Sequence, residues 1–517
     1  MSAQQNTTFR IATITTFLAA VIFDQLFWDQ DIGINLPVFS VLIIALLVAD
    51  QGWSGFSRST RVATFGVLIS AFSMAWQGSI IATIAMCSTL VVCSAFAHAP
   101  SLRAVTFATV QWMSNVVSTP LGLFATVGNV LPDNTGFRKG WRSGRLVFLP
   151  LLVLAVFFLL YKGGNSKFDA MTAGFLDTIG EYFSRFFTEV FTPHTLFFLF
   201  GLVLTASLLI RYAGNRLIHA EGAMADTLKR MRVKRAHWLP PLAMGALDRE
   251  RRMAVVLLVL VNALLLVVNA IDIQWVWFGF MVEPGMSLKE FVHEGTWLLI
   301  ISILLSMAIL FYQFRGNMNF HPKNRTLILL ASAWLVQNFI LGVSVFLRNY
   351  HYISFHGLAY KRIGVIVFLV LMLVGLVTLF IKIRERKSFF YLVRVNGWAA
   401  FAMLVSLGTV DWDSTIVRYN LHHWNQGEID VDNYLAMSDK VLPLLYADMD
   451  RVREQMSKHQ ENATRWVTRL DPNTFSADLN GRKADFLEQY RTQDWQSWTF
   501  ADRRTYLALT KDHETPD

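Results

Sequence analysis

Hydrophobic residues along the first four-fifths of the chain occur in long runs that few charged residues interrupt. A helix needs about 20 apolar residues to cross the hydrocarbon core of a bilayer. Eleven runs come near that length, and they cover residues 11–28, 36–50, 62–76, 79–97, 145–161, 194–211, 252–270, 296–313, 327–346, 363–381 and 394–410. The pattern predicts an all-α fold, a polytopic transmembrane helix bundle of about 11 spans within residues 1–410.

Two segments between these runs have a different pattern. Residues 104–131 are apolar but are interrupted by Gln111, Asn115 and Pro120, which favours a re-entrant or interfacial hairpin over a full span. In residues 168–191, apolar side chains recur at helical spacing and charged side chains lie between them. This pattern is typical of an amphipathic helix on a membrane surface, here the outer one.

The pattern changes after Val410, where the chain becomes polar and acidic. Residues 411–517 are rich in helix-forming residues and contain turn signals such as Asn480-Gly481. Leucines near Leu442 and several aromatic residues supply apolar surface for a modest core. We expect a small, acidic helical domain here, on the extracytoplasmic side.

The composition agrees with a membrane protein. Of the 517 residues, 54% are hydrophobic and 16% are charged, whereas a soluble globular protein has about 25% charged residues. The two cysteines, Cys87 and Cys93, lie in one apolar run, so we expect buried thiols rather than a disulfide framework.

The net charge of +9 is unevenly distributed. Residues 1–410 contain 33 basic and 18 acidic residues, whereas residues 411–517 contain 13 and 19. If Met1 is cytoplasmic, the inner loops hold 26 of those 33 basic residues, so the positive-inside rule predicts an inner N-terminus and an outer C-terminus. The rule explains the basic loops without a nucleic-acid partner, and the run Lys229–Arg235 is expected to contact anionic lipid headgroups.

Common catalytic and phosphate-binding motifs are absent from the sequence. It contains no CxxC pair, no GxSxG nucleophile elbow and no glycine-rich phosphate loop. The pair His293-Glu294 lacks the second histidine of the zinc-binding HExxH motif. We therefore predict no metal site and no cofactor.

Polar residues within or beside the apolar runs are the candidate functional residues, because placing them in lipid is costly. Those within the runs are Asp24, Asn262, Asn269, Gln337 and Asn338. Those at or near the predicted outer ends of spans seven to eleven are Asp272, His293, Glu294, Arg348, His351, His356, Arg362, Asp411, Asp413, Arg418, Tyr419 and Asn420. The densest group lies in Gln337–Arg362, which we expect to leave its span near residue 346 and to cross a loop.

Several of these residues also have a purely structural interpretation. Asn262, Gln337 and Asn338 can bond neighbouring helices, which contributes about 0.6 kcal/mol on average in membrane proteins. The outer histidines titrate near neutral pH and can carry protons, but they lack the spacing of metal ligands.

The two outer arginines, Arg348 and Arg362, run against the charge bias of the loops. We therefore expect them to pair with acidic residues, and the candidates are Asp272, Glu294 and Asp411. Such pairs either hold helices together or also bind a ligand.

The most specific stretches of the chain are FDQLFW at 23–28, RRMAVVLLVLVNALLLVVNAID at 251–272, VHEGTWLLIISILL at 292–305, QNFILGVSVFLRNYHYISFHGLAYKRIGV at 337–365 and VDWDSTIVRYNL at 410–421. Together they resemble one bacterial family of multi-pass inner-membrane proteins, catalogued as a domain of unknown function. The resemblance covers most of the predicted membrane region and the start of the C-terminal domain. It implies a bacterial inner-membrane location and brings no established activity.

Three functions are compatible with these residues. The first is transport or ligand sensing, in which a polar or anionic ligand binds at the outer ends of spans seven to eleven. The second is a membrane-embedded enzyme of envelope assembly that acts on lipid-linked or surface-polymer substrates, with His293, Glu294, Asp411 or Asp413 as acid–base groups. The third is a structural or signalling role in which residues 411–517 bind another envelope protein. We favour the first, because ionisable residues concentrate at one depth and no catalytic signature is present.

Overall fold

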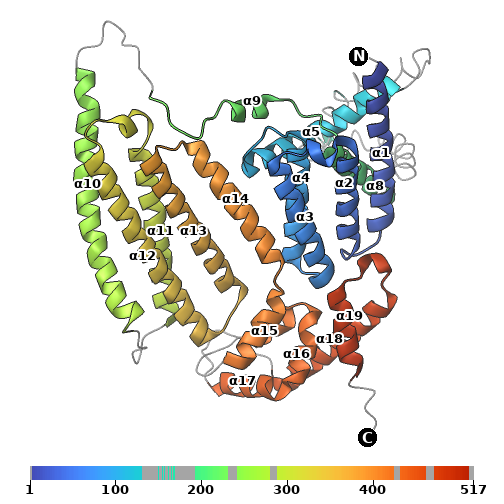
Figure 1. The fold of residues 1–517 in the computed structure, drawn as a ribbon. Helices are drawn as coiled ribbons and strands as arrows, with labels where there is room; N and C mark the ends of the chain where they lie inside the picture. Colours follow the sequence, from blue (N-terminus) through green and yellow to red (C-terminus); the bar gives the residue numbers. More distant parts are fainter. Residues whose placement is uncertain are drawn as a thin grey trace.

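The computed structural model of the protein describes residues 3–130, 192–230, 242–279, 288–423, 431–461 and 471–511, with a few positions between 150 and 168. Within these ranges nearly the whole chain is helical (Figure 1), and the β pairing there is an isolated bridge between Thr227 and Lys387. The predicted all-α fold is confirmed for the described residues.

The helices of the first bundle are α1 (Ala3–Phe27), α2 (Asn35–Gln51), α3 (Arg58–Gln77), α4 (Ile80–His98) and α8 (Pro193–Leu209). Hydroxyl side chains at the N-caps Ser57, Ser79 and Thr192 accept backbone N–H bonds and so satisfy donors that a helix leaves open. The turn between α3 and α4 is short, and its Gly78 has a φ of +58°, which glycine adopts without strain. Buried apolar side chains from these helices share one core.

The helices of the second bundle are α10 (Leu242–Asp272), α11 (Leu288–Gln313), α12 (Arg325–His356) and α13 (Tyr360–Glu385). At its end α10 continues into a π-helical turn, η2 (Ile273–Trp277). A second core lies among these helices. Between the bundles lies α14 (Phe389–Gly408), which packs on both α13 and α4 (Figure 1).

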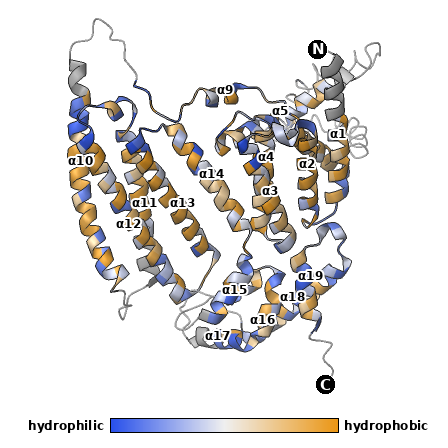
Figure 2. Cartoon of the chain, in the orientation of Figure 1, coloured by the Kyte–Doolittle hydropathy of each residue, from blue (hydrophilic) through white to orange (hydrophobic). Residues whose placement is uncertain are grey.

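Among the described residues, six helical segments are long and apolar enough to cross a membrane: Ile80–His98, Leu247–Trp277, Gly295–Gln313, Arg325–His356, Tyr360–Glu385 and Phe389–Gly408. Shorter apolar helices are Thr13–Phe27, Asn35–Gln51 and Pro193–Leu209. Figure 2 shows hydrophobic residues along most of the length of these helices. The chain is therefore an integral membrane protein.

Ten of the eleven predicted runs coincide with described helices. The run at 145–161 lies mostly outside the described residues, and so does the predicted amphipathic helix at 168–191, apart from Phe168. Eleven crossings and their orientation stay predictions.

The segment predicted as a hairpin, 104–131, forms one helix, α5 (Val105–Val130), so the hairpin is wrong. Pro120 lies inside this helix without ending it, although an interior proline removes one backbone hydrogen bond. The polar residues that interrupt the apolar pattern bond to another segment, as described next, and do not mark a chain reversal.

Asn115 on α5 satisfies the backbone at the end of α8. It is 3% exposed, and a helix C-terminus leaves carbonyl groups without partners inside the helix. Its amide nitrogen donates to two carbonyls and its oxygen accepts from two N–H groups, at 2.7–3.0 Å, and these belong to Ser207, Ile210, Tyr212 and Ala213. This side chain therefore joins α5 to α8.

The loop predicted after residue 346 is also wrong, because α12 continues as helix to His356. The apolar run ends earlier than the helix does, and polar residues of the last three turns bond to neighbouring helices. The turn to α13 consists of residues 357–359 only. Gly357 in this turn has a φ of +78°, a conformation that favours glycine.

The C-terminal helices are α15 (Trp412–His423), α16 (Leu442–Ala447), α17 (Met449–Glu461), α18 (Pro472–Thr492) and α19 (Phe500–Lys511). The short turns among them are η4 (Asp432–Ala436), η5 (Asp439–Val441) and η6 (Trp495–Ser497). They share a third core, in which Val441, Phe475 and Leu479 are fully buried. Figure 1 shows these helices across the ends of both bundles, opposite the N-terminus and α9 (Arg216–Gly222).

The turn between α1 and α2 binds directly to η6 and the residue after it. The N–H of Ile34 donates to the carbonyl of Trp498 at 2.9 Å, and the N–H of Asp31 donates to Ser497 Oγ at 3.0 Å. Gly33 lies so close that a Cβ there would be 2.3 Å from the carbonyl carbon of Ser497. The two backbones meet at van der Waals distance.

Gly33→Ala is expected to separate this turn from the C-terminal helices. The atoms nearest the added methyl are backbone atoms of Ser497, so the backbone itself must shift. We expect a destabilisation of about 1–3 kcal/mol and faster tryptic cleavage within α18 and α19. Thermal unfolding and limited proteolysis in detergent measure both effects. Gly55→Ala is the matched control, because the nearest atom to its Cβ is 3.9 Å away; equal behaviour of the two variants would contradict the prediction.

Candidate functional site

The predicted intramembrane amides connect α10 and α12. Gln337 Nε2 donates to Asn262 Oδ1 at 2.8 Å, and Asn262 Nδ2 donates to the carbonyl of Leu330 at 3.1 Å. Two turns further along α10, Asn269 Nδ2 donates to the carbonyl of Gln337 at 3.0 Å. Asn338 donates within its own helix, to Trp334. Asn262, Asn269 and Gln337 therefore join α10 to α12, whereas Asn338 forms its hydrogen bond within α12.

Arg348 on α12 forms a buried ion pair with Asp272 at the end of α10. Its Nη2 lies 2.5 Å from Asp272 Oδ1, and the two side chains are 9% and 6% exposed. A Cβ at Gly295 on α11 would lie 3.3 Å from Arg348 Nη1, so the guanidinium sits where three helices meet. Asp272 is one of the three acidic residues predicted as partners of Arg348.

The π-helical turn η2 holds the same end of α12. Trp277 Nε1 donates to Ser344 Oγ at 2.9 Å, and His351 Nε2 lies 3.2 Å from the carbonyl of Val276. His351 is therefore part of the α10–α12 interface.

The turn between α12 and α13 is bound by Asn420 on α15. The N–H of Leu358 donates to Asn420 Oδ1 at 2.6 Å, and Asn420 Nδ2 donates back to the carbonyl of Leu358 at 3.0 Å. Gly357 is needed for this approach, because a Cβ there would lie 2.6 Å from Asn420 Oδ1. One amide thus fixes the turn to the C-terminal helices.

Arg362 caps the end of α12. Its Nη1 donates to the carbonyl of His356 at 2.7 Å and also to that of Gly357, and its guanidinium lies 4.6 Å from the centre of the Tyr352 ring. A cation there is stabilised by the carbonyl end of the helix. None of these contacts of Arg362 involves Asp272, Glu294 or Asp411, the acidic partners expected from the sequence.

Asp413 on α15 binds α13 and the chain before η5. Its carboxylate accepts from the Tyr360 hydroxyl at 2.5 Å and from the Ser438 Oγ and N–H at 2.5 and 3.3 Å. Together with Asn420, it attaches α15 to the beginning of α13.

A cavity of about 400 Å³, which we call the turn cavity, opens between the α12–α13 turn, α15 and η4. Three predicted residues meet in its lining: His356, Arg362 and Asn420. The lining also includes Lys361, Asn433 and Tyr434, which were not among the candidates. Lys361 lies in the dense polar stretch and was recognisable there; nothing in the local sequence singles out the other two.

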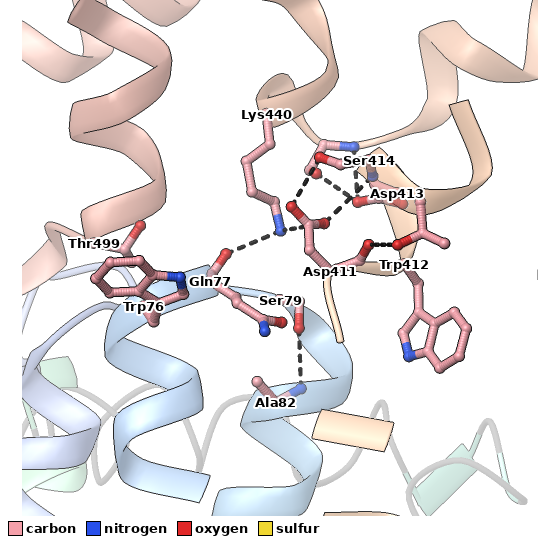
Figure 3. Close-up of polar contacts among 12 residues, drawn as sticks. Trp76, Gln77, Ser79, Ala82, Asp411, Trp412, Asp413, Ser414, Lys440 and Thr499 are labelled. Atoms are coloured by element: carbon pink, nitrogen blue, oxygen red, sulfur yellow. Dashed lines mark hydrogen bonds and ion pairs between the residues drawn. The ribbon is translucent and has the colours of Figure 1, made fainter. Parts of the chain in front are cut away.

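Asp411 belongs to a second group, where the C-terminal helices meet the end of α3 (Figure 3). Its carboxylate accepts from Ser414 Oγ at 2.8 Å and lies 3.6 Å from Lys440 Nζ. Lys440 donates to the carbonyl of Gln77 at 2.9 Å, and the Gln77 amide donates to the carbonyl of Thr409. The chain of contacts runs from α15 to the carbonyl end of α3.

Arg504 on α19 binds the same helix end. Its Nη2 donates to the carbonyl of Trp76 at 3.1 Å, and its guanidinium lies 4.6 Å from the centre of the indole ring system. Lys440 and Arg504 thus place positive charge where a helix dipole is negative. A cavity of about 210 Å³, the junction cavity, is lined by Arg418, Lys440, Arg504 and Asp411. Burial raises the pKa of the neighbouring Asp502 carboxyl.

Four predicted residues remain: Asp24, Tyr419, His293 and Glu294. Asp24 on α1 lies 2.8 Å from His194 Nε2 on α8, within the first bundle. Burial raises the pKa of the Tyr419 hydroxyl on α15. His293 and Glu294 belong to α11, and their side chains lie outside the described part of the structure.

A family model described as a domain of unknown function, DUF4153, matches residues 60–447. The chain belongs to this family. The resemblance to a family catalogued as a domain of unknown function is therefore confirmed, whereas the bacterial inner-membrane location stays a prediction. The DUF4153 match extends from α3 to the end of α16 and includes both cavities except for the part contributed by α19. No curated protein and no solved structure matches the chain.

Proposed function

We propose that this protein is a ligand sensor of the bacterial inner membrane that binds a small anionic molecule in the turn cavity. The single observation that carries the proposal is the composition of that cavity. It joins the basic side chains of Lys361 and Arg362 at the start of α13 to amide and phenol groups of the C-terminal helices and turns, and none of its described lining residues is acidic.

A carboxylate or phosphate fits such a lining. Lys361 is exposed and supplies a mobile positive charge, while Arg362 is held by the end of α12. Asn433 and Tyr434 can orient the ligand through hydrogen bonds. The cavity volume lies within the usual range for small-molecule sites, about 300–1,000 Å³.

We favour sensing over transport because the polar residues within the membrane-crossing helices bond to other helices or within their own and so do not line a path for a solute. Asn262, Gln337 and the Asp272–Arg348 pair bond helix to helix. At membrane depth, the cavity described between α12 and α13 has apolar lining residues, such as Leu335 and Phe380. The polar groups that can bind a polar solute lie at the end of the bundles that the C-terminal helices cover.

The contacts of α15 supply a route by which ligand binding can reach the first bundle. Asn420 and Asp413 bind the α12–α13 turn and α13, whereas Asp411 contacts Lys440, which binds the end of α3. A small displacement of α15 by a ligand changes both sets of contacts together, so the two bundles respond jointly.

The charge distribution supports an outer location for the turn cavity. At the end that carries α9, basic side chains bond to neighbouring segments: Arg103 to the carbonyl of Glu221, Arg315 to Glu250 and Arg394 to Asp226. The N-terminus lies at that end and the C-terminal helices at the other (Figure 1). By the positive-inside rule, the α9 end is cytoplasmic and the turn cavity is extracytoplasmic.

The test uses the purified full-length protein and a panel of succinate, glutamate and inorganic phosphate. We expect at least one of them to raise the unfolding temperature, since a ligand at 100 times its dissociation constant adds about 2.7 kcal/mol. Lys361→Ala removes the shift, and Lys323→Ala, an exposed lysine at the opposite end, keeps it. No shift with any of the three, or an equal shift in both variants, contradicts the proposal. Uptake of the same compound into proteoliposomes would favour transport.

A further inference from the structure

An apolar groove of about 510 Å³ lies between α3 and the end of α14, beside the junction cavity. Its walls include Leu68, Ile69 and Phe72 on α3 and Thr409 after α14. Phe72 is 68% exposed, and such exposure is favourable where the surroundings are lipid rather than water. α14 is one of the membrane-crossing helices, and α3 packs along another, α4.

The groove ends at Trp76, where the surface changes from apolar to basic. Trp76 is 42% exposed, and the exposed Arg504 lies over its ring and bonds its carbonyl. A tryptophan at this position is typical of the interface between hydrocarbon and headgroups. Just beyond it, Arg418 and Lys440 line the junction cavity (Figure 3 shows Lys440 and Trp76).

The basic side of this boundary carries an excess of positive charge. The lining of the junction cavity contains Arg418, Lys440 and Arg504 against one carboxylate, Asp411, which already lies 3.6 Å from Lys440. An arginine guanidinium matches a phosphate through paired hydrogen bonds. A ligand that matches both sides is therefore apolar at one end and anionic at the other.

We propose that the groove and the junction cavity together bind one anionic phospholipid of the surrounding leaflet. An acyl chain lies along Leu68, Ile69 and Phe72, and the phosphate accepts hydrogen bonds from Arg504. The field of Arg418 and Lys440 favours a headgroup with net negative charge over a zwitterionic one. This proposal goes beyond the ligand sensor and does not depend on what binds in the turn cavity.

Native mass spectrometry of the full-length protein in a neutral detergent tests the site. We expect one molecule of dioleoylphosphatidylglycerol to be retained roughly tenfold more strongly than dioleoylphosphatidylcholine, because its headgroup charge is uncompensated. Arg504→Gln lowers this retention by roughly tenfold, and Arg503→Gln, an exposed neighbour outside the cavity lining, leaves it unchanged. If Arg504→Gln does not fold, Arg418→Gln is used and should lower retention in the same direction.

A separate variant tests the apolar groove, which we expect to hold the acyl chain. Ile69→Trp fills the groove and is expected to reduce retention of both lipids, whereas Phe65→Trp, on the same face but outside the groove lining, is not. Equal retention of the two lipids, equal effects of Arg504→Gln and Arg503→Gln, or no effect of Ile69→Trp would overturn the proposal. Retention of inorganic phosphate in place of the lipid would identify a soluble anion site instead.

Discussion

Arg348→Ala is expected to destabilise the protein by about 3–5 kcal/mol, because it leaves the carboxylate of Asp272 buried without its counter-charge. The pair is enclosed by α10, α11 and α12, and both side chains are less than one-tenth exposed. Water has little access to replace the guanidinium. Thermal unfolding of the purified protein in detergent measures the loss.

The control for Arg348→Ala removes both charges. A double variant, Arg348→Met with Asp272→Leu, is expected to recover most of the stability, since a buried ion pair replaced by apolar residues of similar size is often neutral or stabilising. An Arg348→Ala protein as stable as the wild type, but without a ligand response, would assign Arg348 to ligand binding instead.

Asn115→Ala is expected to cost at least about 3 kcal/mol, since each buried backbone group left without a partner costs about 1–3 kcal/mol. Asn115 serves two carbonyls and two N–H groups at the end of α8. Its loss therefore loosens α8 from α5. Hydrogen exchange of the amides at residues 212 and 213 reports the opening directly.

Ser118→Ala is the matched control for Asn115. Ser118 lies one turn further along α5 and donates only to the carbonyl of Ser114 in the same helix, at 2.8 Å. We expect a change within about 0.5 kcal/mol. Similar losses in both variants would mean that α5 is sensitive to any substitution, and that the contacts of Asn115 are not its main contribution.

The positions of the apolar helices were predictable from the sequence, because lipid forces the backbone to satisfy its hydrogen bonds within each segment. The residues at which the helices end were harder to predict from the sequence. α12 continues ten residues beyond its predicted run, from 346 to His356, since Arg348 finds its partner on α10 and His351 finds one in η2. Hydropathy reports the apolar part of a helix and is blind to a polar extension that a neighbour stabilises.

The site was predictable only where its residues follow one another closely. His356 and Arg362 lie in one dense stretch, and both line the turn cavity. Lys440 was not recognised, because its partner is the carbonyl of Gln77, 363 residues away. Nothing near position 440 indicates that the C-terminal helices cover the end of α3, and only the packing of separate segments brings the two together.

The contact between the α1–α2 turn and η6 has a consequence for biosynthesis. Gln30 and Ser497 are 467 residues apart, so at about 5–20 residues per second the turn waits roughly 20–90 s for its partner to be made. Until then the N–H of Ile34 lacks the carbonyl of Trp498 as its acceptor. A nascent chain that stops before Trp498 can therefore contain every hydrophobic helix and still lack the hydrogen bond that holds the α1–α2 turn.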